Sequence, residues 1–240
     1  MSMTLRRLAS TLILALACAS RAPAVPLIVT PTGEGRYRPE VDLLVDGHRV
    51  RAELDTGART TSLIRDPQLA RYAVWQRVAT GGAFGPGASV DLIRPHRLSA
   101  GSELFLDPYV LRPSTGAHSL LGIDLLGLRP FQVDFRNASL HFPSGLLQTA
   151  CLPLRVLHTK HAVVPVRIGE KAMEALFDTG AEVTLVDLAV ARANPRTFEL
   201  ARSEEGTDST GHRSVTPIYR IRSLAVGPLE LEGVEAAAVP

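Results

Sequence analysis

The four residues D-T-G-A occur twice in this chain, at 55–58 and again at 178–181. Each copy follows two short apolar-leaning runs joined by a turn dipeptide, Asp46-Gly47 in the first case and Gly169-Glu170 in the second. Asp-Gly between alternating apolar runs is typical of a β-hairpin. Because an internal repeat marks a repeated structural unit, the chain is predicted to fold as two similar lobes.

The segments around the two motifs are predicted to be mostly β-strand. Apolar residues alternate before each aspartate, and Gly, Pro and Ser separate the runs. The fold class expected is all-β with short helices, in two pseudo-symmetric β-barrel lobes. Strands are predicted at 37–45, 48–54, 89–93, 104–111, 131–135, 139–142, 162–168 and 171–177, and short helices at 123–128 and 187–193.

The repeat also gives the predicted domain boundaries. Residues 25–148 form the first lobe, 149–160 the connection between lobes, and 161–240 the second lobe. With 240 residues, 45% of them apolar, the chain can bury a core in each lobe. Only 5% of the residues are aromatic, so the cores are expected to be aliphatic.

Composition and motifs argue against several classes of function. The net charge is +2 and the basic residues are dispersed, which disfavours a nucleic-acid partner. Neither H-E-x-x-H nor G-x-S-x-G occurs, and no nucleotide-binding glycine motif is found. His158 and His161 lie three residues apart without nearby carboxylates, so a solvated connector is favoured there over a metal site.

The paired aspartates suggest a specific chemistry. Two carboxylates brought within hydrogen-bonding distance share one proton, so one can deprotonate a water while the other protonates an amide. Asp55 and Asp178 are therefore the predicted catalytic pair. The hydroxyls of Thr56 and Thr179 could bond the opposite loop, and glycine as the third residue would allow a close backbone approach.

With these motifs, the sequence resembles the retropepsin-like aspartic proteases, in the single-chain, two-lobed arrangement of bacterial secreted members and of the pepsin group. Both copies match the family's active-site motif, each after a strand ending in Leu54 or Phe177. The resemblance implies an aspartic endopeptidase acting on a polypeptide, with water as nucleophile and no metal or other cofactor. It assigns loop-support roles to Thr56, Gly57, Ala58, Thr179, Gly180 and Ala181.

Two further family elements have matches. The apolar-apolar-Gly element corresponds to Leu120, Leu121 and Gly122, followed by Ile123-Asp124. The family also has a mobile hairpin flap between the aspartate and this element; glycine-rich tips suit a moving lid, although a loose surface loop is the alternative. The flap candidates are Gly82, Phe84 and Gly85 in the first lobe and Gly206 and Gly211 in the second. No counterpart of the pepsin-type flap tyrosine is recognised.

The second lobe departs from the pattern at its end. A counterpart of Leu120 is not reached before Pro240, so the expectation is a cropped chain whose natural form continues for about 25 residues. Two alternatives stay open. The protein could be a non-catalytic peptide-binding module on the same fold, or a protease active only as a homodimer. Two lobes in one chain favour a monomer.

The N-terminus predicts export. Arg6 and Arg7 precede an apolar run over 8–19 and the small residues Ala22-Pro23-Ala24, the order of a secretory signal that is too short to span a bilayer. Residues 1–24 are therefore the predicted signal peptide of a secreted or periplasmic protein. Cys18 offers a lipid-anchored alternative, and Cys151 is expected to be a buried apolar residue.

We predict that the protein isolated from its host begins near Val25, because the cleavage-site residues end at Ala24. N-terminal sequencing checks this. An intact Met1 on a cytosolic protein would contradict it, and a lipidated Cys18 would replace it with the anchored form.

Overall fold

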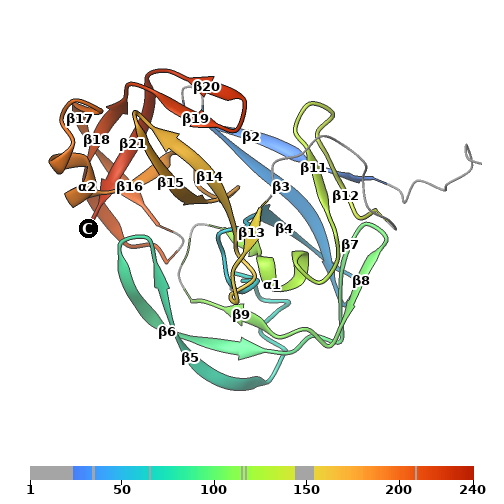
Figure 1. Cartoon of the computed structure of the whole chain (residues 1–240). Coiled ribbons are helices and arrows are strands. Elements are labelled where there is room, and N and C mark those ends of the chain that lie inside the picture. Colours follow the sequence, from blue (N-terminus) through green and yellow to red (C-terminus); the bar gives the residue numbers. More distant parts are fainter. Residues whose placement is uncertain are drawn as a thin grey trace, which may run out of the picture.

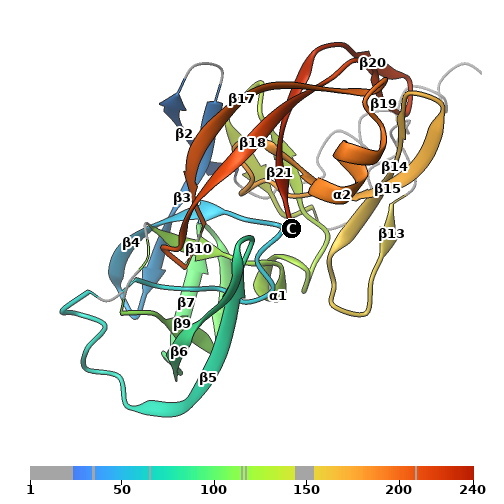
Figure 2. The same ribbon diagram turned by 90° about the vertical axis from the view of Figure 1, so that its left-hand side faces the viewer.

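The computed structural model describes residues 24–33, 36–64, 66–114, 116, 118–143, 154–208 and 210–240. Most of the predicted signal peptide, Cys18 and Cys151 lie outside these residues. The described chain is mostly β and forms two lobes, the first in blue to green and the second in yellow to red (Figure 1). A view turned by 90° shows the same separation (Figure 2).

The first lobe is built on a six-stranded sheet that ends beside the first D-T-G-A motif. Its hairpin β3–β4 turns at Asp46-Gly47, where both residues have positive φ, the backbone that a two-residue hairpin turn needs. The strand order is β10 (Ser119–Leu121), β4 (His48–Leu54), β3 (Arg36–Val45), β7 (Arg97–Ala100) and β8 (Glu103–Leu106), with β2 (Ile28–Gly33) also paired to β3.

Two smaller sheets complete this lobe. A long hairpin, β5 (Val74–Gly82) and β6 (Gly85–Ile93), pairs with β9 (Val110–Arg112). The other sheet joins β1 (Val25–Pro26), β12 (Ser139–His141) and β11 (Gln132–Asp134), so the start of the described chain closes onto the end of the lobe. One helical turn, α1 (Ile123–Leu126), follows β10.

The second lobe repeats much of this plan. One sheet contains β13 (Arg155–Val156), β14 (Ala162–Ile168), β19 (Leu224–Val226) and β20 (Leu229–Leu231), with β15 (Lys171–Leu176) paired to β14. The other contains β16 (Thr184–Asp187), β21 (Val234–Val239), β18 (Arg213–Ile221) and β17 (Phe198–Thr207). Helix α2 (Leu188–Ala193) is capped by the Asp187 carboxylate, which accepts from the backbone N–H groups of Ala189 and Val190.

The two lobes differ at the strand that supports the D-T-G-A loop. In the first lobe β10 pairs in parallel with β4, directly before Asp55. Among the described residues, β15 has only β14 as a strand partner, and no counterpart of β10 pairs with it. The second lobe thus has the hairpin before its aspartate but not the flanking strand.

Several element boundaries differ from the sequence prediction. The strand predicted at 104–111 is two strands, β8 and β9, because the chain turns at Asp107, which has a φ of 48°. Part of the predicted connection, Arg155–Val156, is strand β13. Several strands were not predicted, among them β2, β5, β17 and β18. Strands β5 and β17 are mostly exposed, so their apolar alternation is weak.

Each lobe has its own aliphatic core. The first is formed by fully buried leucines, valines and isoleucines such as Leu43, Leu54 and Leu121. The second is smaller and contains Val166, Ile221 and Ala236. The low aromatic content predicted cores of this kind, and Phe105, Phe142, Phe198 and Tyr219 are their buried aromatic members.

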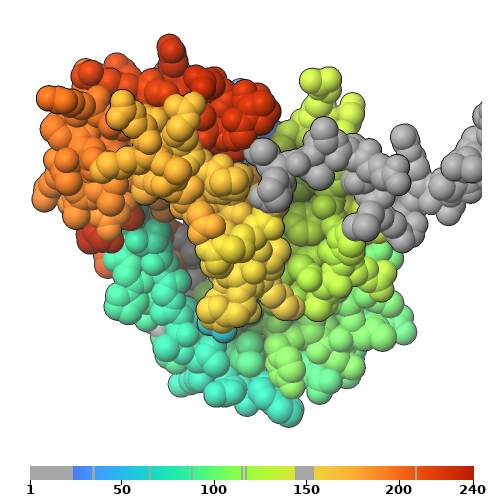
Figure 3. Space-filling view, viewed as in Figure 1, coloured from blue at the N-terminus to red at the C-terminus, as the bar shows by residue number. Residues whose placement is uncertain are grey.

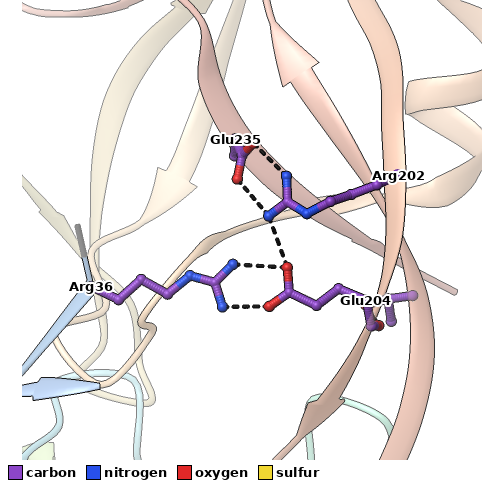
Figure 4. A network of polar contacts seen from close by, with 5 residues as sticks. Arg36, Arg202, Glu204 and Glu235 are labelled. Atoms are coloured by element: carbon purple, nitrogen blue, oxygen red, sulfur yellow. Dashed lines mark hydrogen bonds and ion pairs between the residues drawn. The ribbon is translucent and has the colours of Figure 1, made fainter. Parts of the chain in front are cut away.

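An ion-pair network ties the two lobes together away from the motifs. Arg36 of β3 donates two hydrogen bonds to Glu204 of β17, at 2.6 and 3.0 Å (Figure 4). Arg202 contacts Glu204 and makes two bonds to Glu235. The hydrogen bonds from Arg36 and then Arg202 lower the pKa of Glu204. This bidentate contact fixes the entry of β3 against the second lobe.

Candidate active site

The two D-T-G-A loops meet between the lobes through a reciprocal exchange of threonine hydrogen bonds. The Thr56 hydroxyl donates to the carbonyl of Phe177 at 2.7 Å and accepts from the N–H of Thr179 at 3.0 Å. The Thr179 hydroxyl donates to the carbonyl of Leu54 at 2.5 Å and accepts from the N–H of Thr56 at 3.1 Å. Each hydroxyl uses its single hydrogen and a lone pair, so both loop ends are held.

Each motif glycine lies against the carboxylate of the opposite loop. A Cβ built on Gly57 would lie 2.3 Å from Cγ of Asp178, and one on Gly180 would lie 2.4 Å from Cγ of Asp55. Any side chain at either position would push the carboxylate away. Glycine is therefore required by the close approach, and this approach brings the two predicted catalytic residues together.

Asp55 and Asp178 differ in their local hydrogen bonds. Oδ1 of Asp55 accepts from the N–H of Gly57 at 2.9 Å and from that of Ala58 at 2.8 Å. Oδ1 of Asp178 accepts from the N–H of Gly180 at 2.9 Å. Burial, followed by the negative charge of Asp178, raises the pKa of Asp55 to about 7, against the opposing effect of the backbone donors.

The apolar-Gly element braces the first loop from behind. Leu120 and Leu121 are buried in β10, and the N–H of Asp55 donates to the Leu121 carbonyl at 3.1 Å. A Cβ on Gly122 would lie 2.9 Å from the Ala58 carbonyl, so this position also needs glycine. Asp124 accepts from the backbone N–H and the hydroxyl of Thr61, at 2.9 and 2.7 Å. Ala181, at the corresponding end of the second motif, is exposed.

A buried carboxylate lies two residues before Asp55. Glu53 is 3% exposed, and its Oε2 lies 3.3 Å from Nε2 of His118 and 3.6 Å from Nε of Arg38. Arg38 also donates to Glu182 of the second lobe at 2.7 Å. Burial and the charge of Asp55 raise the pKa of Glu53 to about 8, although Arg38 opposes the shift.

The predicted flap residues lie on two hairpins whose tips touch. Gly82, Phe84 and Gly85 form the tip of β5–β6, while Gly206 lies in β17 and Gly211 in the turn after it. A Cβ on Gly206 would contact the Phe84 ring at 3.3 Å. In the space-filling view the teal β5–β6 hairpin abuts the orange and red second lobe (Figure 3).

One carboxylate links these tips. Asp208 is 8% exposed; its Oδ2 accepts from the N–H of Phe84 at 3.1 Å, and its Oδ1 accepts from Thr210 and His212. Burial alone would raise the pKa of Asp208, but these hydrogen bonds outweigh it and lower the pKa. A Cβ on Gly82 would lie 2.3 Å from Oδ2 of Asp208, which gives this glycine a packing role.

Sequence reasoning missed four residues near the site: Arg38, Glu53, His161 and Asp208. His161 was predicted to lie in a solvated connector, but it is half-buried and its Nε2 lies 3.0 Å from the Gly57 carbonyl. An alignment of the two hairpins could have pointed to Arg38 and His161. Each lies two residues before the residue that pairs with the position two before the motif aspartate. Glu53 was visible only as one of the polar residues that alternate with Val50, Ala52 and Leu54.

No group of three or more His, Cys, Asp or Glu side chains is placed to hold a metal ion among the residues that the structure describes. Within the same residues, no helix is long and apolar enough to cross a membrane.

Comparisons with known proteins point to one family for the second lobe. Residues 164–240 match the family described as aspartyl protease; the match includes the second D-T-G-A motif and not the first. A search of curated proteins gave no match. A retropepsin-like aspartic protease from Rickettsia conorii is similar in structure, with 15% identity and a TM-score of 0.34 over 50% of this chain and 94% of that one. The family match supports a relationship to aspartyl proteases.

We predict that Glu53→Gln makes the protein more stable at pH 8 and changes little at pH 5. The folded-state pKa of Glu53 lies above its ordinary value, so its contribution to stability is fully present below about 4.5 and is lost as the pH rises through about 8. An amide carries no such dependence. The gain at pH 8 should be a few kcal/mol at most, or several degrees in Tm.

Thermal unfolding of wild type and variant across this pH range measures the effect. Glu170→Gln, which changes an exposed glutamate in the β14–β15 turn, is the control and should leave the pH dependence as it is. Equal slopes for wild type and Glu53→Gln would show that Glu53 titrates normally. Part of the slope should remain in the variant, since Asp55 contributes with the same sign.

Proposed function

We propose that the protein is an aspartic endopeptidase that hydrolyses peptide bonds with a water molecule activated by Asp55 and Asp178. The observation that carries the proposal is the reciprocal threonine exchange, which sets two carboxylates from two lobes against each other. The family match to the second lobe supports the same activity. The dyad is complete within one chain, which favours an active monomer over a homodimer.

The proposed reaction uses the shared proton of the pair. The ionised carboxyl takes a proton from water as the oxygen attacks the amide carbon, and the protonated carboxyl supports the developing oxyanion. The carboxyl that took the proton from water then passes it to the amide nitrogen. The C–N bond breaks to give an amine and a carboxylic acid, and the pair returns to its starting state. The close packing of Gly57 and Gly180 keeps both carboxyls in place during these transfers.

The hairpins β5–β6 and β17–β18 are proposed to cover a bound polypeptide. Their tips are joined by the Asp208–Phe84 hydrogen bond, so a peptide would enter by opening this contact. From the signal-like N-terminus we further propose that the protein acts in the periplasm or outside the cell.

A non-catalytic peptide-binding role is the second candidate. The observation that favours it is the unequal support of the two loops: Asp55 is braced by β10 and α1, whereas Asp178 accepts a single backbone bond from its own loop among the described contacts. A loosely held carboxyl could still line a peptide site without completing turnover.

We predict that Asp55→Asn and Asp178→Asn each reduce peptide cleavage by at least about 1000-fold with little effect on folding, because an amide is nearly isosteric but cannot act as base and acid in turn. The double variant should be no worse than either single one, since the two residues act as a unit. Digestion of a peptide library measures this, with circular dichroism to check the fold.

The pH dependence of cleavage by the wild-type protein provides an independent check. Activity should be highest on the acid side of neutral and fall above about pH 7, where the second proton leaves the pair. Chelators and serine-protease reagents should have no effect. Cleavage that survives Asp178→Asn would remove the second motif from the mechanism, and peptide binding without cleavage by the wild type would favour the binding module.

A further inference from the structure

The connection between the lobes places a histidine on the catalytic loop of the first lobe. His161 directly precedes β14, and its Nε2 lies 3.0 Å from the carbonyl oxygen of Gly57. A carbonyl can only accept, so Nε2 carries the hydrogen. Nδ1 lies 3.0 Å from the Thr159 hydroxyl, which can donate to it when the ring is neutral. The two contacts together select one tautomer and fix the ring.

The bond from His161 reaches Asp55 through one peptide group. The Gly57 carbonyl belongs to the same peptide as the Ala58 N–H, and these two groups point in opposite directions. That N–H donates to Oδ1 of Asp55 at 2.8 Å. His161, the peptide and the carboxylate thus form a continuous chain of hydrogen bonds. Such chains polarise each member, so the bond from His161 strengthens the donor that faces Asp55.

In the first lobe the residue equivalent to His161 is Arg38, and it makes a different contact. Glu53 and Leu176 both lie two residues before a catalytic aspartate, and they pair with Glu40 and Val163. Arg38 lies two residues before Glu40, and His161 lies two residues before Val163. Each therefore reaches across to the other lobe's loop, but Arg38 binds the Glu182 side chain at 2.7 Å, whereas His161 binds a main-chain carbonyl.

We propose that His161 is a positioning residue that orients the Gly57–Ala58 peptide toward Asp55 and so favours the ionised form of Asp55. The inference rests on the proposed function, in which Asp55 is one of the two carboxyls that exchange protons with water and substrate. The bond is available in both charge states of the ring, because Nε2 carries a hydrogen in each.

Other charged groups also act on Asp55 and Asp178, and the substitutions at position 161 leave them in place. Those facing Asp55 are Asp178 across the loops and, around β4, Glu53, Arg38, His118 and Glu182. On the outer side of His161, Lys160 donates to the Asp124 carbonyl at 3.4 Å. None of them belongs to the hydrogen-bond chain from His161 to Asp55.

The test compares His161→Met with His161→Gln. The two side chains are similar in length, but only glutamine can donate to the Gly57 carbonyl. Carbon-13 NMR of aspartate-labelled protein, with the Asp55 signal assigned from Asp55→Asn, follows the ionisation of this carboxyl directly. In His161→Met the midpoint should move to higher pH by about 0.5 to 1 unit, a three- to tenfold change in the ionisation constant. His161→Gln should stay close to the wild type.

Two controls make the result specific. His158→Met changes an exposed histidine of the same turn and should leave the Asp55 midpoint unchanged. Thr159→Val keeps the imidazole ring but frees its tautomer, so a smaller shift in the same direction is expected; it also serves if His161→Met does not fold. Equal midpoints for the Met, Gln and wild-type proteins would overturn the proposal, as would a shift with His158→Met.

The activity profile separates this proposal from the proposed function. If the wild type cleaves peptides, the limb of its kcat/KM profile that reports Asp55, near pH 7, should move upward in His161→Met and recover in His161→Gln. If the wild type does not cleave peptides, the proposed function fails, yet the NMR midpoints still decide whether His161 acts on Asp55.

Discussion

The exchange of hydrogen bonds between Thr56 and Thr179 is the constraint on which the rest of the site depends. Each hydroxyl bonds the carbonyl and the N–H of the opposite loop, so neither loop can move without breaking two bonds of the other. Thr56 is 2% exposed, and a buried hydroxyl left without its partners costs about 1–3 kcal/mol. The close approach of the loops follows from this exchange and makes glycine necessary at 57 and 180.

Around this centre the contacts between lobes become progressively less symmetric. The threonine and glycine contacts are nearly the same from both sides. In the hairpins before the motifs, Arg38 and His161 occupy equivalent positions. Arg38 binds the carboxylate of Glu182, whereas His161 binds the carbonyl of Gly57. Farther out, Arg36–Glu204 and Phe84–Asp208 have no repeated partner among the described contacts. This gradient agrees with the proposed mechanism, in which the two carboxyls perform different proton transfers.

The sequence predicted the parts of the structure that depend on local patterns. The two hairpins before Asp55 and Asp178 were predicted because alternation and turn dipeptides are local signals, and β4 and β14 have the predicted bounds. Of the hairpins β5–β6 and β17–β18, only residues 89–93 of β6 and the glycine-rich tips were predicted. Strands β5 and β17 are mostly exposed, so the apolar alternation that marks a strand is weak in them.

The residues around the dyad were harder to predict for the same reason. Glu53 occupies a polar position in the alternating pattern of β4, and its role becomes visible only when β10 brings His118 beside it. His161 reads as part of a polar connector until β14 pairs with β15 and places it on the first loop. Asp208 needs both hairpins in place before its bond to Phe84 exists. These roles come from contacts between residues distant in the chain, which a local pattern does not encode.

The central claim is that one chain assembles one complete dyad from its two lobes. Titration calorimetry with a peptide mimic that carries a hydroxyl in place of the scissile amide tests it most directly, because such a mimic resembles the hydrated amide and binds both carboxyls together. Light scattering on the same sample gives the mass of the complex. The account predicts one mimic bound per chain in a monomer, with binding lost in both Asp55→Asn and Asp178→Asn. One mimic per two chains, or tight binding that survives either substitution, would contradict it.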